Sequence, residues 1–364
     1  MATETPTRLY QSIHAQPAAI RSLLQEWDGP ELAAQRVAQA GRILIAGIGT
    51  SFHAASVGEY ILRAAGGEAW AVRSFEFVQY PRRLHKDDVV IVISHRGNKQ
   101  QGSLALQRAK EAKVPVIGIT GKHSKMSGAD ITLETVEQDP SSTHSISYTA
   151  TLTRLAQIAI QLAKLNGKAQ QGQRLEEGLS GVPALMERSL AREAEIQKIA
   201  QEAVQQRRRL YFVGAGPNAI TAFEGALKAK EAAYVTTEGF ELEQAIHGPL
   251  VAFEADDLLI PINVQGSAQS RMTDLLLALN EIGSRAWLIG DAPGEQTAAA
   301  FQRDNWSSFP LFIGANFPEE LTPLLTVVPA QLLADFLARE RGNDADAFRL
   351  DHEAYKRAMA RLHL

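Results

Sequence analysis

Short runs of apolar residues alternate along most of this chain with longer stretches of helical composition. Each run has the length of a buried strand. The six runs are Ile43–Ala46, Val89–Ile93, Val116–Ile119, Leu210–Val213, Leu258–Ile262 and Ala286–Ile289. Strands that are continuously apolar and alternate with helices form parallel sheets with helices on both faces. We therefore predict an α/β protein with doubly wound, flavodoxin-like parallel sheets.

The strand and helix pattern occurs twice. A strand, a G-x-G turn and a helix begin at Arg42 and again at Arg209, and a second matching pair of segments begins at Asp87 and Asp256. The members of the two pairs are 167 and 169 positions apart (209 minus 42 and 256 minus 87). Such a constant offset indicates one fold present twice.

The repeat sets the expected domain limits. We predict a first domain with a helical lead-in over residues 1–190, a second domain over 191–342 and a C-terminal tail over 343–364. The linker lies in the charged, helical stretch 165–206, with the glycine- and proline-containing segment 178–183 as its joint.

Composition narrows the class of protein. The chain has 364 residues, 45% hydrophobic content, a formal charge of −4 and no cysteine. This is large enough for two cores, and the near-neutral charge argues against nucleic acid as a partner. Without cysteine there is no disulfide, thiolate metal site or thiol nucleophile. We find no signal pattern and no apolar run as long as a membrane span, and expect a cytoplasmic protein.

One predicted helix carries a row of charged residues. Glu224, Lys228 and Glu231 stand at i, i+4 and i+7, so they project from one face, and His247 follows at a predicted helix C-terminus before Gly248. Two carboxylates, an amine and an imidazole are suited to proton transfer on a carbonyl compound. On spacing alone, a solvated helix face with weak ion pairs is the simpler interpretation.

The glycine turn after the first strand resembles the start of a dinucleotide-binding fold, but the third glycine and an acidic ribose partner are missing. A P-loop is excluded because no G-K-[ST] occurs. The turn ends in Gly49, Thr50 and Ser51, whose hydroxyls and backbone N–H groups could receive a phosphate at the helix start. Thr50 and Ser51 could equally be N-cap residues.

The string FEGALKAKEAAY, followed by IHGPL, resembles the tandem sugar-isomerase (SIS) family, and within it the isomerase part of the glucosamine-6-phosphate synthases. The resemblance implies that His247 opens the pyranose ring by moving a proton between O1 and O5. It implies that Glu231 carries a proton between C1 and C2, that Lys228 stabilises the developing charge and that Glu224 orients Lys228. In this family the equivalent histidine comes from a neighbouring subunit, so a homodimer is expected, and no metal or organic cofactor is needed.

The turn after the second strand departs from the family's pattern. The family's turn resembles SQSGET, whose hydroxyls hold the sugar phosphate; here it reads SHRGNK, and only the serine and the glycine match. The implied substrate-binding residues of this turn are Ser94, His95, Arg96, Asn98 and Lys99. The two new cations suit a phosphate, but they could also mark a carboxylate-bearing substrate or simply face solvent.

Two further segments resemble the family in part. In the hydroxyl-rich loop 139–149, the resemblance implies that Ser142 and Thr143 contact the substrate through their hydroxyls. The family's lysine in this loop is not retained, and Ile146 falls near its place. His144 is a lone loop histidine. The family's C-terminal arginine is closely followed by a lysine that forms an imine with the open-chain sugar. Here Lys356 follows at a distance and could take that role or be an ordinary helical lysine.

The resemblance implies an aminosugar-phosphate isomerase of deaminase type that converts glucosamine 6-phosphate to fructose 6-phosphate and ammonia. A fructosamine-6-phosphate deglycase and a ketose/aldose phosphate isomerase are close alternatives, and a sugar-phosphate-binding regulator is the alternative of another class. The chain begins at what resembles the isomerase part, so we expect no ammonia to be made here from glutamine.

Overall fold

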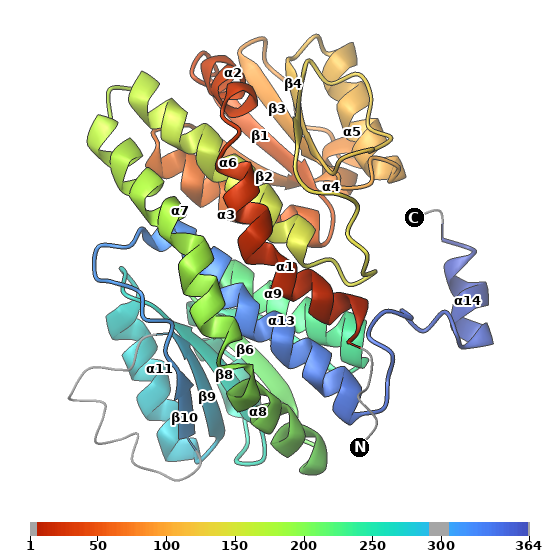
Figure 1. Cartoon of the computed structure of the whole chain (residues 1–364), viewed down its shortest axis with the longest axis vertical. Helices are drawn as coiled ribbons and strands as arrows, with labels where there is room; N and C mark the ends of the chain where they lie inside the picture. Colours follow the sequence, from red (N-terminus) through yellow and green to blue (C-terminus); the bar gives the residue numbers. More distant parts are fainter. Residues whose placement is uncertain (1–5, 291–305, 363–364) are drawn as a thin grey trace. The chain divides into compact units, whose positions relative to one another are not determined.

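A computed structural model of the protein describes residues 6–290 and 306–362 (Figure 1). The chain forms two compact units, one of Met1–His14 with Ala184–Phe348 and the other of Ala15–Pro183 with Arg349–Leu364. Each unit contains one five-stranded parallel sheet. The predicted fold class, a repeated doubly wound α/β sheet, is confirmed.

The first sheet has the strand order β2-β1-β3-β4-β5. Its strands are β1 (Arg42–Gly47), β2 (Ala69–Arg73), β3 (Asp88–Ile93), β4 (Val116–Thr120) and β5 (Ile131–Glu134). Strands β3 and β4 are buried along their whole length, whereas the edge strands β2 and β5 are partly exposed. The sequence order jumps across β1 and β3, and this switch point is where ligands bind in open α/β sheets.

Alternate residues of β1 contact helices on opposite faces of the first sheet. On one face, Ala46 packs in a core with Phe77 of α4 (Ser74–Gln79) and Ala105 of α5 (Gln100–Glu111). On the other face, Ile45 lies beside Gly58 of α3. The helices of that second face are α2 (Asp28–Val37), α3 (Thr50–Ala64) and α6 (Ile146–Leu165).

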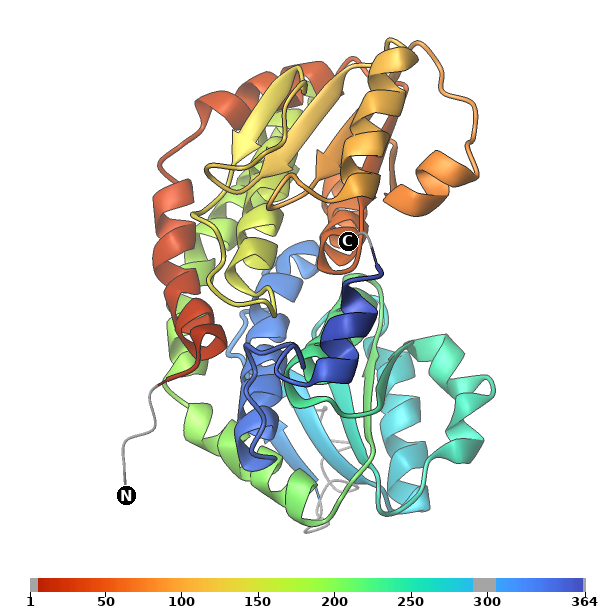
Figure 2. The same cartoon turned by 90° about the vertical axis from the view of Figure 1, so that its right-hand side faces the viewer.

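The second sheet has the equivalent order β10-β9-β8-β6-β7. Its strands are β6 (Leu210–Gly214), β7 (Thr237–Glu241), β8 (Leu258–Asn263), β9 (Arg285–Gly290) and β10 (Trp306–Phe309). Figures 1 and 2 show α11 (Gln269–Ile282) on one face and α9 (Pro217–Ala233) with α13 (Pro323–Glu340) on the other.

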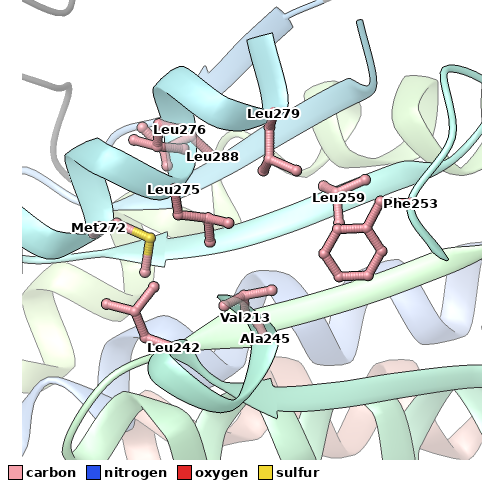
Figure 3. Packing of buried hydrophobic residues seen from close by; sticks show 10 residues of the cluster. All are labelled: Val213, Leu242, Ala245, Phe253, Leu259, Met272, Leu275, Leu276, Leu279 and Leu288. Atoms are coloured by element: carbon pink, nitrogen blue, oxygen red, sulfur yellow. The ribbon is translucent and has the colours of Figure 1, made fainter. Parts of the chain in front are cut away.

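The core of the α11 face is a cluster of buried apolar side chains from strands and helices (Figure 3). Val213, Leu259 and Leu288 of the sheet meet Met272 and Leu275 of α11. On the opposite face, Phe212 lies against Gly225 of α9. Helix α9 is therefore held directly on the sheet.

The remaining elements are α1 (Arg8–Leu23), α7 (Ala169–Leu190), α8 (Glu193–Gln205), α10 (Leu242–Ile246), η1 (Pro249–Ala252), η2 (Glu319–Leu321) and α14 (Glu353–Met359). Segment 178–183, predicted as the joint of the helical linker, lies inside the continuous helix α7. The boundary between the two units nevertheless falls at Pro183. The predicted domain limits themselves stay a prediction.

Helix α13 corrects one expectation from the sequence. The stretch Glu319–Glu340 is long and apolar enough to cross a membrane by length and composition, although no such run was expected. Its apolar window is completely buried within the protein, and the helix packs on α9 and α8. This is the environment of a core helix.

The repeat extends to an ion pair between a partly exposed arginine and a buried aspartate at the start of each sheet. Arg42 Nε donates to Asp88 Oδ1 over 2.8 Å, and Arg209 Nε donates to Asp257 Oδ1 over 2.7 Å. In both units the aspartate also accepts a backbone N–H from three residues earlier, at His85 and Glu254. The same contact thus joins the first two central strands of each sheet.

We expect Asp88→Asn to lower the free energy of unfolding by about 1.5–3 kcal/mol, because a buried carboxylate loses charged hydrogen bonds. Burial acts to raise the pKa of Asp88, but Arg42 and the His85 N–H outweigh it, and the pKa lies below its ordinary value. The stabilisation is therefore complete above the unfolded pKa of about 4 and is lost as the pH falls through the lower folded value. Urea unfolding at several pH values measures this.

The exposed neighbour Asp87 supplies the control. Asp87→Asn should leave the free energy of unfolding nearly unchanged. Equal stability of the two variants at neutral pH would contradict the assigned role of the Arg42–Asp88 pair.

Candidate functional site

Both glycine turns have the same backbone geometry. Gly49 precedes α3 with φ 53° and ψ −128°, and Gly216 precedes α9 with φ 53° and ψ −130°. A positive φ of this size favours glycine. A Cβ on Gly47 would lie 2.3 Å from the Ser51 carbonyl oxygen, so that position also needs a glycine.

Thr50 and Ser51 lie in the first turn of α3, and both are partly buried. The N-cap is Gly49 and not a hydroxyl residue, so the alternative that Thr50 and Ser51 are N-cap residues is wrong. Helix α3 begins at the carboxyl end of β1, beside the switch point of the first sheet. Their predicted contact with a ligand stays a prediction.

The three charged residues of α9 form a buried ion-pair network. Lys228 Nζ lies 2.6 Å from Glu231 Oε2 and 3.4 Å from Glu224 Oε1. The side chains of Glu224 and Lys228 are 0% and 1% exposed, whereas that of Glu231 is 20% exposed. A solvated helix face would be exposed throughout, so the simpler interpretation of this spacing is wrong.

Charge pairing controls the protonation of Lys228. Burial acts to lower the pKa of Lys228, but the carboxylates of Glu224 and Glu231 outweigh it and the pKa is raised above its ordinary value. The amine is therefore an ammonium at neutral pH. It can stabilise negative charge but cannot act as a free amine nucleophile. Glu231 alone combines contact with this ammonium and access to solvent.

His247 lies at the end of a different, short helix. It is the C-cap residue of α10, as the sequence predicted, and its side chain is 72% exposed. Its Nε2 atom lies 3.1 Å from Glu243 Oε2. In the described part of the chain this imidazole thus pairs with Glu243 and not with the charged residues of α9.

The turn after β3 presents its charged residues to solvent. Ser94 is buried, and its carbonyl oxygen accepts a 2.9 Å hydrogen bond from Thr120 Oγ1. Gly97 has φ +65°, and a Cβ there would lie 2.2 Å from the Met126 backbone nitrogen. Gly97 thus packs against the segment around Met126, whereas Arg96, Asn98 and Lys99 are exposed.

Lys99 is the N-cap residue of α5. Although Lys99 is largely exposed, partial desolvation of its ammonium group, and then the charge of Arg96, lowers the pKa of Lys99. The two cations thus repel each other at the carboxyl end of β3, which favours an anion at this place.

His95 is held by a residue that the sequence did not single out. The Asp139 backbone N–H donates to His95 Nε2 over 2.9 Å, so a neutral His95 carries its proton on Nδ1. Within the described residues this Nδ1 has no hydrogen-bond partner. Burial, followed by the charge of His144, lowers the pKa of His95 to about 4. The ring is therefore a neutral donor at physiological pH.

The Asp139 carboxylate organises the hydroxyl-rich loop. It is fully buried and accepts backbone N–H groups from Ser141 at 3.2 Å and Ser145 at 3.0 Å. His144 Nδ1 lies 3.8 Å from the same carboxylate, and its ring is edge-on to His95 with the centroids 5.8 Å apart. His144 is thus part of a cluster and not an isolated loop histidine.

The two hydroxyl residues carried over for this loop differ in exposure. Ser142 is partly exposed, whereas Thr143 is completely buried, and its backbone N–H donates to Ser141 Oγ over 3.1 Å. Thr143 belongs to the interior of the loop, so Ser142 is the better placed of the two for a ligand. Ile146 is buried at the start of α6.

The C-terminal segment contacts α9 through backbone groups. Asn343 Nδ2 donates to the Ala233 carbonyl over 2.9 Å, and Tyr234 Oη donates to the Asp344 carbonyl over 3.2 Å. Lys356 lies on α14, is 65% exposed and is 3.9 Å from Glu353. These are the surroundings of an exposed helical lysine, and its role as an amine nucleophile stays a prediction.

Among residues 6–290 and 306–362 there is no group of three or more His, Asp or Glu placed to hold a metal ion.

Comparison with known proteins places the chain in a family. The sequence profile of the SIS domain matches residues 36–161, which include the glycine turn and β3. Over 93% of its length, the chain is 33% identical to a glutamine–fructose-6-phosphate aminotransferase (isomerizing) of Gloeobacter violaceus. The chain belongs to the tandem SIS-domain family. It spans about half the length of such relatives, covering 56% of the Gloeobacter protein.

Two solved structures are similar in fold over nearly the whole chain. The C-terminal domain of the glucosamine-fructose-6-phosphate aminotransferase of Francisella tularensis is 22% identical, with a TM-score of 0.83 over 94% of this chain and 99% of that one. The glucosamine-6-phosphate deaminase of Thermotoga maritima is 19% identical, with a TM-score of 0.70 over 94% and 97%. At these identities the likeness concerns the fold alone.

Proposed function

We propose that this SIS protein is an aminosugar-phosphate isomerase of deaminase type. It converts glucosamine 6-phosphate and water to fructose 6-phosphate and ammonia. The observation that carries the proposal is the buried Glu224–Lys228–Glu231 network, in which Glu231 alone is open to solvent. The kinship with an aminotransferase that acts on fructose 6-phosphate supports an aminosugar phosphate as the substrate class.

The network suits enolisation of an open-chain sugar. Glu231 removes the proton from C2 and returns it to C1. Over the same step O1 gains a proton and the amine nitrogen loses one, so that the C1=O1 double bond is replaced by the imine C2=N. The Lys228 ammonium, 2.6 Å from Glu231, stabilises the negative charge of the enediol-like intermediate. Glu224 keeps that ammonium charged and in place. Water then adds to the imine carbon at C2, and ammonia leaves.

His247 performs the preceding ring opening by moving a proton from O1 to O5. Since its side chain is largely exposed, we propose a homodimer in which His247 reaches the site of the neighbouring subunit. Sedimentation analysis tests the dimer. A cytoplasmic location remains an expectation.

The phosphate is proposed to bind at the turn after β3, together with the start of α3. Arg96 and Lys99, which are both exposed at this turn, supply the positive charge. We expect Arg96→Gln with Lys99→Gln to weaken glucosamine 6-phosphate binding by about 10-fold to 100-fold, because each charged hydrogen bond contributes about 1.5–3 kcal/mol and part is recovered by solvent. Isothermal titration calorimetry measures this.

Lys122 and Lys125 are the matched controls, as basic residues of the neighbouring loop. Their Gln variants should bind normally. If the Arg96 and Lys99 variants bind as tightly as the wild type, the phosphate does not lie at this turn.

The reaction is tested by incubating the purified protein with glucosamine 6-phosphate and measuring ammonia and fructose 6-phosphate. Release of both in equal amounts supports the proposal. Turnover of a fructosamine 6-phosphate alone indicates a deglycase, and turnover of an amine-free sugar phosphate alone indicates a ketose/aldose isomerase. Binding that raises the melting temperature without any turnover indicates a regulator.

A further inference from the structure

A chain of charged contacts leads from the α11 helix to His247. Glu243 of α10 lies 3.1 Å from His247 Nε2 through its Oε2 atom. The same carboxylate accepts two hydrogen bonds from Arg271, at 2.5 Å from Nε and 3.2 Å from Nη2. Arg271 also donates to Asp274 Oδ2 over 3.2 Å. Glu243 therefore bridges a guanidinium and an imidazole.

The ionisation of Glu243 determines which way its hydrogen bond to His247 runs. Arg271, and to a smaller degree His247, lowers the pKa of Glu243 below its ordinary value. An ionised carboxylate only accepts hydrogen bonds, so His247 Nε2 is the donor. In a neutral imidazole this leaves Nδ1 as an acceptor, free to take a proton from a sugar hydroxyl.

The backbone around His247 gives the imidazole little support. Helix α10 has only five residues, and the following Gly248 has φ 128°. Arg271 is better anchored. It belongs to the 14-residue helix α11 and precedes Met272, which is buried in the core of the second sheet (Figure 3). The bridge thus connects a weakly supported side chain to a well-packed helix.

We propose that Glu243 is a positioning residue for His247, anchored by Arg271, and that it fixes the Nε2–H tautomer so that Nδ1 is the proton acceptor in ring opening. This inference rests on the proposed function. In the step concerned, Nδ1 takes the O1 proton, the C1–O5 bond breaks as C1=O1 forms, and O5 receives the proton from Nδ1. A carboxylate that orients an imidazole in this way is a common arrangement for general acid–base catalysis.

The competing interpretation is a surface ion pair without a function. Exposed ion pairs contribute little to stability, so Glu243 variants should fold normally in either case. The two interpretations differ in the tautomer of His247 and in turnover.

The test is nitrogen NMR of histidine-labelled protein, with the His247 signals assigned from a His247→Asn sample. We expect the Nε2–H form in the wild type and in Asp274→Asn, which keeps the Glu243–His247 contact. We expect a mixture of both tautomers in Glu243→Ala, and an intermediate result in Glu243→Gln, which retains an acceptor oxygen. Since misplacing a catalytic group can cost about 100-fold, kcat should fall by up to that factor in Glu243→Ala, with a smaller change in KM, and be normal in Asp274→Asn.

An unchanged tautomer in Glu243→Ala would overturn the inference, as would a changed tautomer with normal kcat. The tautomer is observed without substrate. An inactive wild-type protein that holds the Nε2–H form would therefore count against the proposed function and in favour of the positioning by Glu243.

Discussion

Glu231→Gln is expected to lower kcat by about 100-fold to 10,000-fold, the usual contribution of a general base. The amide has nearly the same size as the carboxylate and can still contact Lys228, which lies 2.6 Å from Glu231 in the native protein. It cannot accept the C2 proton. Binding of the sugar phosphate should change little, because the proposed phosphate contacts lie elsewhere. Steady-state kinetics and calorimetry on the same preparations measure both effects.

The control for this experiment is Glu238→Gln. Glu238 is an exposed carboxylate on β7, the strand that follows α9. Its variant should retain normal kcat. A Glu231→Gln enzyme with normal turnover would show that the base is another group.

Lys228→Met is expected to have the largest effect on stability. It removes the ammonium between Glu224 and Glu231 and leaves the fully buried Glu224 carboxylate without its charged partner. Breaking a buried pair in this way costs about 3–5 kcal/mol. Because the folded pKa of Lys228 is raised, its contribution is complete below the unfolded pKa of about 10.4 and is lost only as the pH rises through the higher folded value. Urea unfolding at neutral pH should therefore record the whole loss.

Lys230→Met is the matched control, because Lys230 is exposed two residues further along the same helix. Its free energy of unfolding should stay within about 0.5 kcal/mol of the wild type. Adding Glu224→Gln to Lys228→Met should recover part of the loss, since the buried charge is then removed. A Lys228→Met protein as stable as Lys230→Met would contradict the account of the network.

The central strands could be predicted from the sequence because they are buried on both faces and therefore continuously apolar. Strands β3 and β9 illustrate this, with every residue buried. The edge strands β2, β5, β7 and β10 were not predicted. Each has a single buried residue among exposed or half-exposed ones, so no apolar run marks it.

The α9 network could be predicted as a face from helical periodicity, but its burial could not. Burial depends on α9 packing against both the sheet and α13, which only the tertiary structure provides. Asp139 was missed for a similar reason. Its contacts with His95 and Ser145 join segments that are distant or irregular in the sequence, where no period exists. The contact of Glu243 with Arg271 joins two different helices, so the sequence does not indicate it. The sequence contains only the i, i+4 spacing of Glu243 and His247.

The most direct test of the central claim, that Glu231 and Lys228 transfer a proton between C1 and C2, is hydrogen exchange with solvent. Fructose 6-phosphate and ammonium are incubated with the protein in deuterium oxide, and proton NMR follows the label. The account predicts deuterium at C1 of fructose 6-phosphate and at C2 of any glucosamine 6-phosphate formed, with the exchange nearly abolished in Glu231→Gln. A protein that binds the sugar phosphate without any exchange, or whose exchange is unchanged in Glu231→Gln, would contradict it.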